Sequence, residues 1–170
     1  SSTYPMDIWV ASRLARLAGA RLVYEVHDLW PASPMELSGM PWWHPFILLC
    51  QKAENDAYRD ADRVVSMLPN GAIVDSAYAE SVIGHAPAGA IMLDCSTIDV
   101  ATARLVTAAA EGAGYAMVDA PVSGGIAAAN AGTLTFMVGG SDAAFARAEP
   151  ILSAMGKAVI HAGGSGAGQG

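Results

Sequence analysis

The sequence predicts an α/β fold, a three-layer sandwich in which helices flank a mostly parallel sheet of about six strands. Short runs rich in β-branched residues alternate with longer segments of helical periodicity, as where Arg63-Val-Val-Ser-Met-Leu68 precedes the helical pattern of 72–84. An apolar fraction of 53% with 15% charged residues indicates a well-buried core. A length of 170 residues suits one domain, which we expect to span 1–170.

The helices and strands follow from periodicity and from residues that start or stop helices. Asp7–Ala18 has apolar residues on one face, and Gly19 is placed to end that helix. Asp99 and Ser141 are placed to cap two later helices, because their short side chains accept the unpaired N–H groups of a first turn. Gly156 is expected to end the second of these in the left-handed conformation. The other expected segments are strands 21–26, 63–68, 90–94, 115–119, 134–138 and 157–161, helices 46–59 and 72–84, and a long loop, 31–45.

Composition also bounds the partners of the chain. A net charge of −7 with nine scattered basic residues argues against a nucleic-acid surface. No apolar run approaches the roughly 20 residues of a membrane span, and the N-terminus shows no signal-peptide pattern. Cys50 and Cys95 fit neither a disulfide framework nor a zinc site, so buried reduced thiols are expected. We therefore expect a cytoplasmic protein with no nucleic-acid, membrane or metal partner.

Several candidate site residues lie where expected strands end. Ser123, Gly124 and Gly125 could form a concave anion site from a hydroxyl and unshielded backbone N–H groups, although Ser and Gly also dominate ordinary turns. Pro69 follows a strand and Thr97 follows another, at the carboxyl ends where open α/β sheets bind ligands. The plainer interpretation is that Pro69 ends its strand and Thr97 helps to cap a helix. Asp94 and Asp119 also end strands, but nothing in the sequence places them within reach of each other as a catalytic pair.

The segment from about 61 to 170 contains, in this order, the motifs Ser66-Met-Leu-Pro69, Asp94-Cys-Ser-Thr-Ile-Asp99, Asp119-Ala-Pro-Val-Ser-Gly-Gly125, Thr133-Leu-Thr-Phe-Met-Val-Gly-Gly140 and Met155-Gly-Lys157. With these motifs it resembles the 3-hydroxyisobutyrate dehydrogenase (β-hydroxyacid dehydrogenase) family. The resemblance implies a Rossmann-like fold, hydride transfer with NAD or NADP, and a small hydroxy acid as substrate. It assigns the substrate to Ser123, Gly124 and Gly125, and the cofactor to Leu68, Pro69 and Thr97.

The chain departs from that family's pattern at both ends. No G-x-G-x-x-G-type turn, which would bring backbone N–H groups to the cofactor pyrophosphate, precedes Ala61. The glycine-rich stretch 163–170 is either a flexible tail or the counterpart of the family's loop before its catalytic lysine. That lysine is expected beyond Gly170, and neither Lys52 nor Lys157 matches its position. No catalytic residue is therefore assigned within the chain, and the family's second, helical domain is missing from it.

The first third of the chain, from 1 to about 69, contains the motifs Ser1-Ser-Thr-Tyr-Pro-Met-Asp7, Tyr24-Glu-Val-His-Asp-Leu-Trp-Pro31, Ser33-Pro-Met-Glu-Leu37, His44-Pro-Phe46, Ala53-Glu-Asn55 and Ala61-Asp-Arg-Val-Val-Ser-Met-Leu-Pro69. With these motifs it resembles the N-terminal domain of family-4-type glycosyltransferases. In that resemblance His27 and Asp28 either orient an acceptor or simply hold a loop, and the four tryptophans are expected to be packing residues. Together the two resemblances imply a fusion, glycosyltransferase-like over 1–62 and dehydrogenase-like over 63–170. The alternatives to a dehydrogenase are an inert scaffold and a glycosyltransferase fragment.

Overall fold

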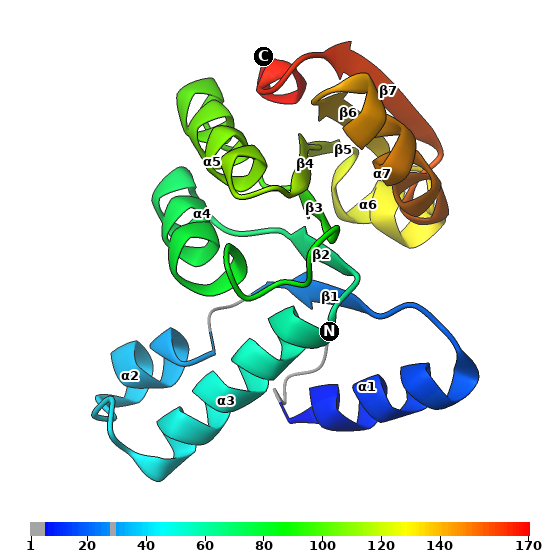
Figure 1. Ribbon diagram of the computed structural model, residues 1–170. Coiled ribbons are helices and arrows are strands. Elements are labelled where there is room, and N and C mark those ends of the chain that lie inside the picture. Colours follow the sequence, from blue (N-terminus) through cyan, green and yellow to red (C-terminus); the bar gives the residue numbers. More distant parts are fainter. Residues whose placement is uncertain (1–5, 28–29) are drawn as a thin grey trace.

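The computed structural model describes residues 6–27 and 30–170, which form a seven-stranded sheet with helices on both faces (Figure 1). The strand order is β1-β2-β3-β4-β6-β5, and β7 pairs with the free side of β6. The strands are β1 (Val23–Val26), β2 (Arg63–Ser66), β3 (Ile91–Asp94), β4 (Ala116–Asp119), β5 (Val122–Ser123), β6 (Thr135–Gly139) and β7 (Ala158–Gly163). The helices are α1 (Asp7–Ala18), α2 (Ala32–Ser38), α3 (Pro45–Asp60), α4 (Gly71–Ala77), α5 (Val100–Gly112), α6 (Gly125–Ala131) and α7 (Asp142–Met155), with a π-helical turn η1 (Tyr78–Val82) and a 3-10 turn η2 (Ala167–Gln169).

The α/β class is confirmed, and most of the strand pairing is parallel as expected, but the sheet is mixed and not purely parallel. β1 to β4 are parallel, and β6 and β7 are parallel to each other. These two groups run in opposite directions, because β4 and β6 are antiparallel and meet only at Asp119 and Gly139. The parallel order is interrupted at this point because the chain between β4 and β6 returns through β5 and the short helix α6 instead of a full helical crossover.

Alternate residues along the central strands pack into two cores on opposite faces of the sheet. Val64 of β2, Met92 of β3 and Met117 of β4 face α3, α4 and α5. Their neighbours Leu93 and Val118 face α7. This period-two alternation buries both faces of the central strands, as expected for a sheet between two helical layers.

The first helix is joined to the rest of the fold through α3. Ile8 of α1 packs on Ala53 and Ala57 of α3. The indole Nε1 of Trp9 donates to Asp56 at 2.8 Å, and Lys52 and Arg59 also reach this carboxylate. These hydrogen bonds, that from Lys52 foremost, lower the pKa of Asp56 to about 2.

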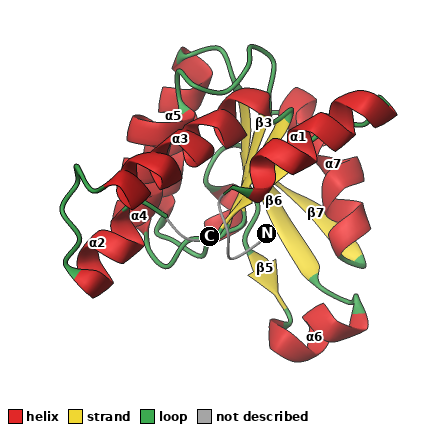
Figure 2. Cartoon of the chain, turned by 90° about the horizontal axis from the view of Figure 1, so that it is seen from below, coloured by secondary structure: helices red, strands yellow, loops and turns green. Residues whose placement is uncertain are grey.

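A small arm projects beyond the carboxyl ends of the parallel strands (Figure 2). Strand β5 pairs antiparallel with β6, and α6 connects the two. Ser123 lies four residues after Asp119, the last residue of β4, and it pairs with Thr135 at the start of β6. At about 3.3 Å per extended residue, this position lies roughly 13 Å beyond Asp119.

Local helix signals in the sequence are confirmed where they involve caps. The helix Asp7–Ala18 ends at Gly19 in the left-handed conformation, with φ 61°. Asp99 and Ser141 cap α5 and α7, each accepting a backbone N–H of the first turn. The expectation of a left-handed conformation at Gly156 is wrong, because its φ of −146° is that of an extended backbone. Glycine is needed there for space, since a Cβ would lie 2.6 Å from the carbonyl oxygen of Leu134.

The expected loop 31–45 contains the short helix α2, which begins after Pro31. The expected packing role of the tryptophans is wrong for Trp42 and Trp43, whose exposed fractions are 70% and 61%. Cys50 and Cys95 are buried free thiols, as expected. Across the described residues, no helix combines the length and apolar character that crossing a bilayer requires.

The buried carboxyl of Glu54 makes the stability of this fold depend on pH. Glu54 is a residue of α3, and its side chain is buried and accepts a hydrogen bond from the hydroxyl of Tyr58 at 3.4 Å. Burial raises the pKa of Glu54 from 4.5 to about 7. The folded state therefore binds the proton of this carboxyl more tightly than the unfolded state does. Protonation of Glu54 thus stabilises the fold; the contribution is complete below pH 4.5 and is lost as the pH rises through about 7.

We expect Glu54→Gln to leave the free energy of unfolding nearly unchanged at pH 4.5 and to raise it at pH 8. The gain at pH 8 is about 3 kcal/mol, because a tenfold difference in proton affinity between the folded and unfolded states corresponds to about 1.4 kcal/mol. Urea unfolding of wild type and variant across this range measures the difference. The matched variant Glu149→Gln, at an exposed position of α7, should show no such pH-dependent gain. Parallel curves for wild type and Glu54→Gln would contradict the assignment.

Candidate functional site

The carboxyl ends of β2 and β3 are joined by a buried polar network. Asp94 Oδ1 accepts from the hydroxyls of Ser66 at 2.9 Å and Ser96 at 2.5 Å, and from the backbone N–H of Ser96. The hydroxyl of Ser66 also contacts that of Tyr78 at 2.8 Å. Burial raises the pKa of Asp94 despite these hydrogen bonds, which lower it, and nearby Asp119 raises it further. The network holds the ends of the two strands in one fixed arrangement.

The three expected cofactor residues lie on loops that this network connects. The backbone N–H of Leu68 donates to the hydroxyl of Ser96 at 2.8 Å, which ties the loop after β2 to the loop after β3. The side chain of Leu68 is buried in the core, whereas Pro69 and Thr97 are exposed. Pro69 and Thr97 therefore contribute to the exposed surface at this edge, and Leu68 supports it from below.

The N-termini of α4 and α5 meet beside these loops. Asn70 caps α4 by accepting from Ile73 N, and Asp99 caps α5 by accepting from Thr102 N. Between them Gly71 is close-packed, since a Cβ there would lie 3.0 Å from Thr102 and 3.2 Å from Asp99. Two helix N-termini consequently point to the carboxyl edge of the sheet, where helix dipoles favour negative charge.

The glycine-rich segment 163–170 is a hydrogen-bonded turn that closes over the same edge, so of its two interpretations the flexible tail is the wrong one. The carboxylate of Asp119 accepts the backbone N–H groups of Gly166 at 2.7 Å and Gly168 at 3.0 Å. A Cβ on Gly168 would lie 2.8 Å from this carboxylate, so no larger residue fits. Gln169 donates to Ser96 O and accepts from Ile98 N, which bonds the turn to the loop after β3.

Asp94 and Asp119 are neighbours, although the sequence does not place them together. They are paired in the register of β3 and β4. Each carboxylate, however, is committed to its own set of donors, serine groups for Asp94 and glycine N–H groups for Asp119. The pair therefore holds the loops and does not supply an exposed acid and base.

The expected substrate residues lie apart from these loops, on the projecting arm. Ser123 is exposed at the end of β5. Gly124 and Gly125 have φ of 127° and 62°, values that favour glycine. A Cβ on Gly124 would also lie 2.5 Å from that of Ala128. The positions share the carboxyl side of the sheet with Pro69 and Thr97.

Three residues considered under the two resemblances have other surroundings, namely Lys52, Lys157 and His27. Lys52 is paired with Asp56 at 2.6 Å on α3, away from the loops after β2 and β3. Lys157 is exposed before β7, on the other side of β6 from Ser123. His27 is exposed with its Nε2 3.5 Å from Glu25, and its expected partner Asp28 lies outside the described residues.

Open α/β sheets of this kind bind ligands, dinucleotides among them, at the carboxyl ends of their parallel strands. The family described as the NAD binding domain of 6-phosphogluconate dehydrogenase matches residues 38–164, and the chain belongs to this family. The expected cofactor, NAD or NADP, is thereby confirmed as the nucleotide of the family. The matched segment begins earlier than the expected boundary near 61.

Relatives include dehydrogenases of small hydroxy acids. An NAD-dependent L-serine dehydrogenase of Pseudomonas aeruginosa is 48% identical over 120 residues, which are 69% of this chain and 40% of that protein. A 3-hydroxyisobutyrate dehydrogenase of the same organism is 48% identical over 111 residues, which are 64% of this chain and 37% of that protein. The chain thus spans about two fifths of the length of these relatives.

A solved structure extends the similarity over nearly the whole chain. The 3-hydroxyisobutyrate dehydrogenase of Mycobacterium tuberculosis, solved with L-serine, has a TM-score of 0.69 and 35% identity, and covers 99% of this chain and 54% of that chain. The glycosyltransferase resemblance of residues 1–69 finds no support in these comparisons, since the structural match includes the first third as well.

The described residues fit one half of a nicotinamide dinucleotide better than the other. Pro69, Thr97 and the paired helix N-termini offer a floor of backbone and small side chains at the ends of β2 and β3. After β1, by contrast, the chain continues through His27 to Trp30 and α2, and its next glycine is Gly39. Bulky residues thus stand where a glycine turn would approach a pyrophosphate.

Asp119→Asn tests the interaction that orders the C-terminal turn. An amide offers one acceptor oxygen, and its NH₂ group would face one of the two glycine N–H donors. We expect unfolding to become easier by about 1–3 kcal/mol, as for a buried donor left unpaired. Hydrogen exchange at Gly166 and Gly168 should also accelerate. The control Asp75→Asn, at an exposed position of α4, should leave both properties unchanged. Unaltered exchange in Asp119→Asn would show that the turn is held by other contacts.

Proposed function

We propose that this chain is the cofactor-binding part of an NAD(P)-dependent dehydrogenase of small 3-hydroxy acids, such as 3-hydroxyisobutyrate or L-serine. The observation that carries the proposal is family membership over residues 38–164, together with relatives named as 3-hydroxyisobutyrate and L-serine dehydrogenases. The order of the loops at the carboxyl edge supports it, because Asp94, Asp119 and the glycine turn fix that edge before any ligand arrives.

In this proposal the nicotinamide half lies on the loops after β2 and β3. Leu68 fixes the floor through its buried side chain and its bond to Ser96, while Pro69 and Thr97 contact the cofactor. The bound cofactor supplies the hydride acceptor or donor. The role of the loops is to hold the ring in one orientation, since hydride transfer requires a near-attack geometry.

The same proposal assigns the substrate carboxylate to the projecting arm. The hydroxyl of Ser123 and the adjacent backbone N–H groups of Gly124 and Gly125 are unshielded by side chains, and all three residues are exposed. Because the arm extends past the carboxyl edge of the sheet, a small acid held there faces the ends of β2 and β3.

Proton transfer needs a group that we do not assign to this chain. Lys52 is bonded to Asp56, and Asp94 and Asp119 are buried among their own donors. We infer that turnover requires a lysine supplied after the glycine turn, as the family resemblance implies. We also propose that residues 1–62 act with 63–170 as one domain, in which β1 supplies the edge strand beside β2.

A second candidate is a Rossmann-like scaffold that binds no nucleotide. The specific observation in its favour is the segment after β1, where Trp30, Pro31 and α2 replace the glycine turn of the pyrophosphate site. Family membership does not by itself decide between the two candidates, because fold and site can diverge.

Titration of the folded chain with NADH separates the candidates. We expect saturable binding in the micromolar range, and we expect Thr97→Trp to weaken it at least tenfold because the indole would occupy the floor. The control Ser153→Trp introduces the same side chain at an exposed position of α7 and should change the affinity less than twofold. Absence of heat at millimolar NADH, with a cooperative thermal melt, would establish the scaffold.

Ser123→Ala tests the carboxylate site. Loss of one hydroxyl donor to a charged group costs about 1.5–3 kcal/mol, so the affinity for 3-hydroxyisobutyrate in the presence of NADH should fall at least tenfold. Ligand-observed NMR measures this affinity. The control Ser153→Ala removes an exposed hydroxyl from α7 and should have no effect. Equal affinities for wild type and Ser123→Ala would remove Ser123 from the site.

A further inference from the structure

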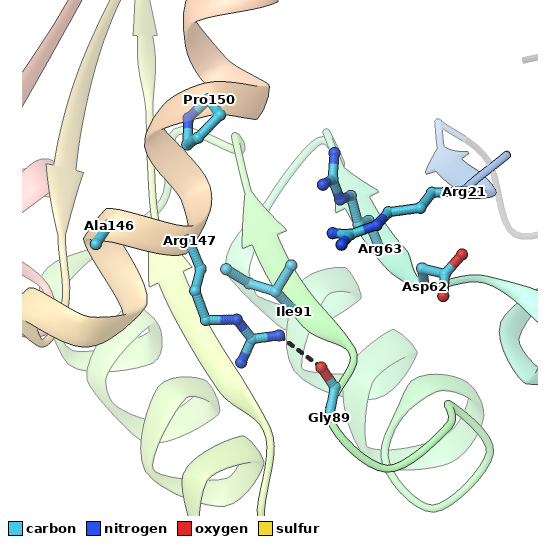
Figure 3. Close-up of a pocket in the computed structure, with 8 residues that line it drawn as sticks. All are labelled: Arg21, Asp62, Arg63, Gly89, Ile91, Ala146, Arg147 and Pro150. Atoms are coloured by element: carbon cyan, nitrogen blue, oxygen red, sulfur yellow. Dashed lines mark hydrogen bonds between the residues drawn. The ribbon is translucent and has the colours of Figure 1, made fainter.

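A cleft of about 560 Å³ lies at the amino ends of the parallel strands, at the opposite edge of the sheet from the loops described above (Figure 3). Arg63 is the first residue of β2 and Ile91 the first of β3, and α7 forms the facing wall. The volume lies within the roughly 300–1,000 Å³ of small-molecule sites. The lining residues are Arg21, Asp62, Arg63, Gly89, Ile91, Ala146, Arg147 and Pro150.

Three arginines converge on this cleft from three separate segments. Arg21 precedes β1, Arg63 begins β2 and Arg147 comes from α7. They are three of only nine basic residues in a chain of net charge −7. Pairing of Val23 with Arg63 places the first two segments side by side, and Figure 3 shows Arg147 across the cleft from them.

Most of the donor capacity of these arginines is unused. Arg147 donates to the carbonyl oxygen of Gly89, which orients its guanidinium along the cleft wall. The side chains of Arg21 and Arg63 make no hydrogen bond or ion pair with any residue in the part of the chain that the structure describes. An arginine has five N–H donors in a planar fork, so two complete forks and most of a third remain available.

The cleft also carries an excess of positive charge. Asp62 is the one carboxylate that lines it within the described residues, and its Oδ2 already accepts the backbone N–H of Leu22 at 3.0 Å. Three guanidinium groups and one carboxylate leave a charge of about +2. Like charges gathered in a cleft repel one another, and a bound anion would relieve that repulsion.

We propose that this cleft binds a small phosphate-bearing anion through Arg21, Arg63 and Arg147. A phosphate group presents several oxygens at the spacing of a guanidinium fork, and arginine recognises it through paired hydrogen bonds. A pyrophosphate or a phosphomonoester carries the two or more negative charges that balance the cleft, whereas a monocarboxylate carries one. The site is separate from the proposed nucleotide site, which lies at the carboxyl edge.

Titration with inorganic pyrophosphate at constant ionic strength tests the proposal. Wild type should bind one pyrophosphate with saturable heat, and Arg63→Gln and Arg21→Gln should each weaken binding at least tenfold. Neither arginine has a partner to lose among the described residues, so both variants should fold, and a thermal melt checks this. If either Arg63→Gln or Arg21→Gln fails to fold, the pyrophosphate affinity of the other variant alone tests the proposal.

Two matched variants locate the bound anion. Arg13→Gln removes the same charge from an exposed position of α1 and should change the affinity less than twofold. Thr97→Trp, which blocks the proposed nucleotide site, should also leave pyrophosphate affinity within twofold. No saturable heat in wild type, equal weakening by Arg13→Gln, or loss in Thr97→Trp would each overturn the proposal. Loss of pyrophosphate binding in Thr97→Trp would place the anion at the carboxyl edge. If the chain fails to bind NADH but still binds pyrophosphate, the proposed function fails and the arginine site stands.

Discussion

The carboxyl edge of this sheet depends on the hydrogen bonds that the carboxylate of Asp119 accepts from the C-terminal turn. Asp119 stands at the end of β4, next to Asp94 in the register and opposite Gly139 of the antiparallel strand β6. Its two oxygens accept the N–H groups of Gly166 and Gly168. This one residue therefore joins both halves of the sheet through its backbone pairing and the C-terminal turn through its carboxylate. The glycines around it are required because a Cβ on Gly139 or Gly168 would enter the space of the carboxylate.

Elements that are specified by a few neighbouring residues could be predicted from the sequence. The helix 7–18 has its stop signal in Gly19, and Asp99 accepts the N–H of Thr102 only three residues away. These interactions are complete within one turn of chain, so periodicity and capping chemistry are enough to find them. The positions of Pro69 and Thr97 at strand ends follow in the same way, because a strand boundary is a local feature.

The remainder could not be predicted because its cause lies in residues distant in the sequence. Glycine is needed at 156 because Leu134 and Phe136, which are distant in the chain, leave no room for a Cβ, whereas the local pattern favours a left-handed cap that the extended backbone does not adopt. The role of Asp119 requires partners 47 and 49 residues later in the chain. Likewise, the antiparallel step between β4 and β6 depends on pairing at a single position, which leaves no signature in the periodicity of either strand.

The two edges of the sheet differ in how their polar groups are used, and this difference bears on what each can bind. The polar side chains at the carboxyl edge already make hydrogen bonds within the protein, as Asp94, Ser96 and Asp119 do. A ligand there must gain its affinity from backbone, helix N-termini and shape, which suits a large dinucleotide with many weak contacts. At the amino edge, Arg63 is held by the register of β1 and β2, and Arg21 precedes β1; their side chains donate to no internal acceptor among the described residues. A ligand at that edge can be small, because a few charge-assisted hydrogen bonds supply its binding energy.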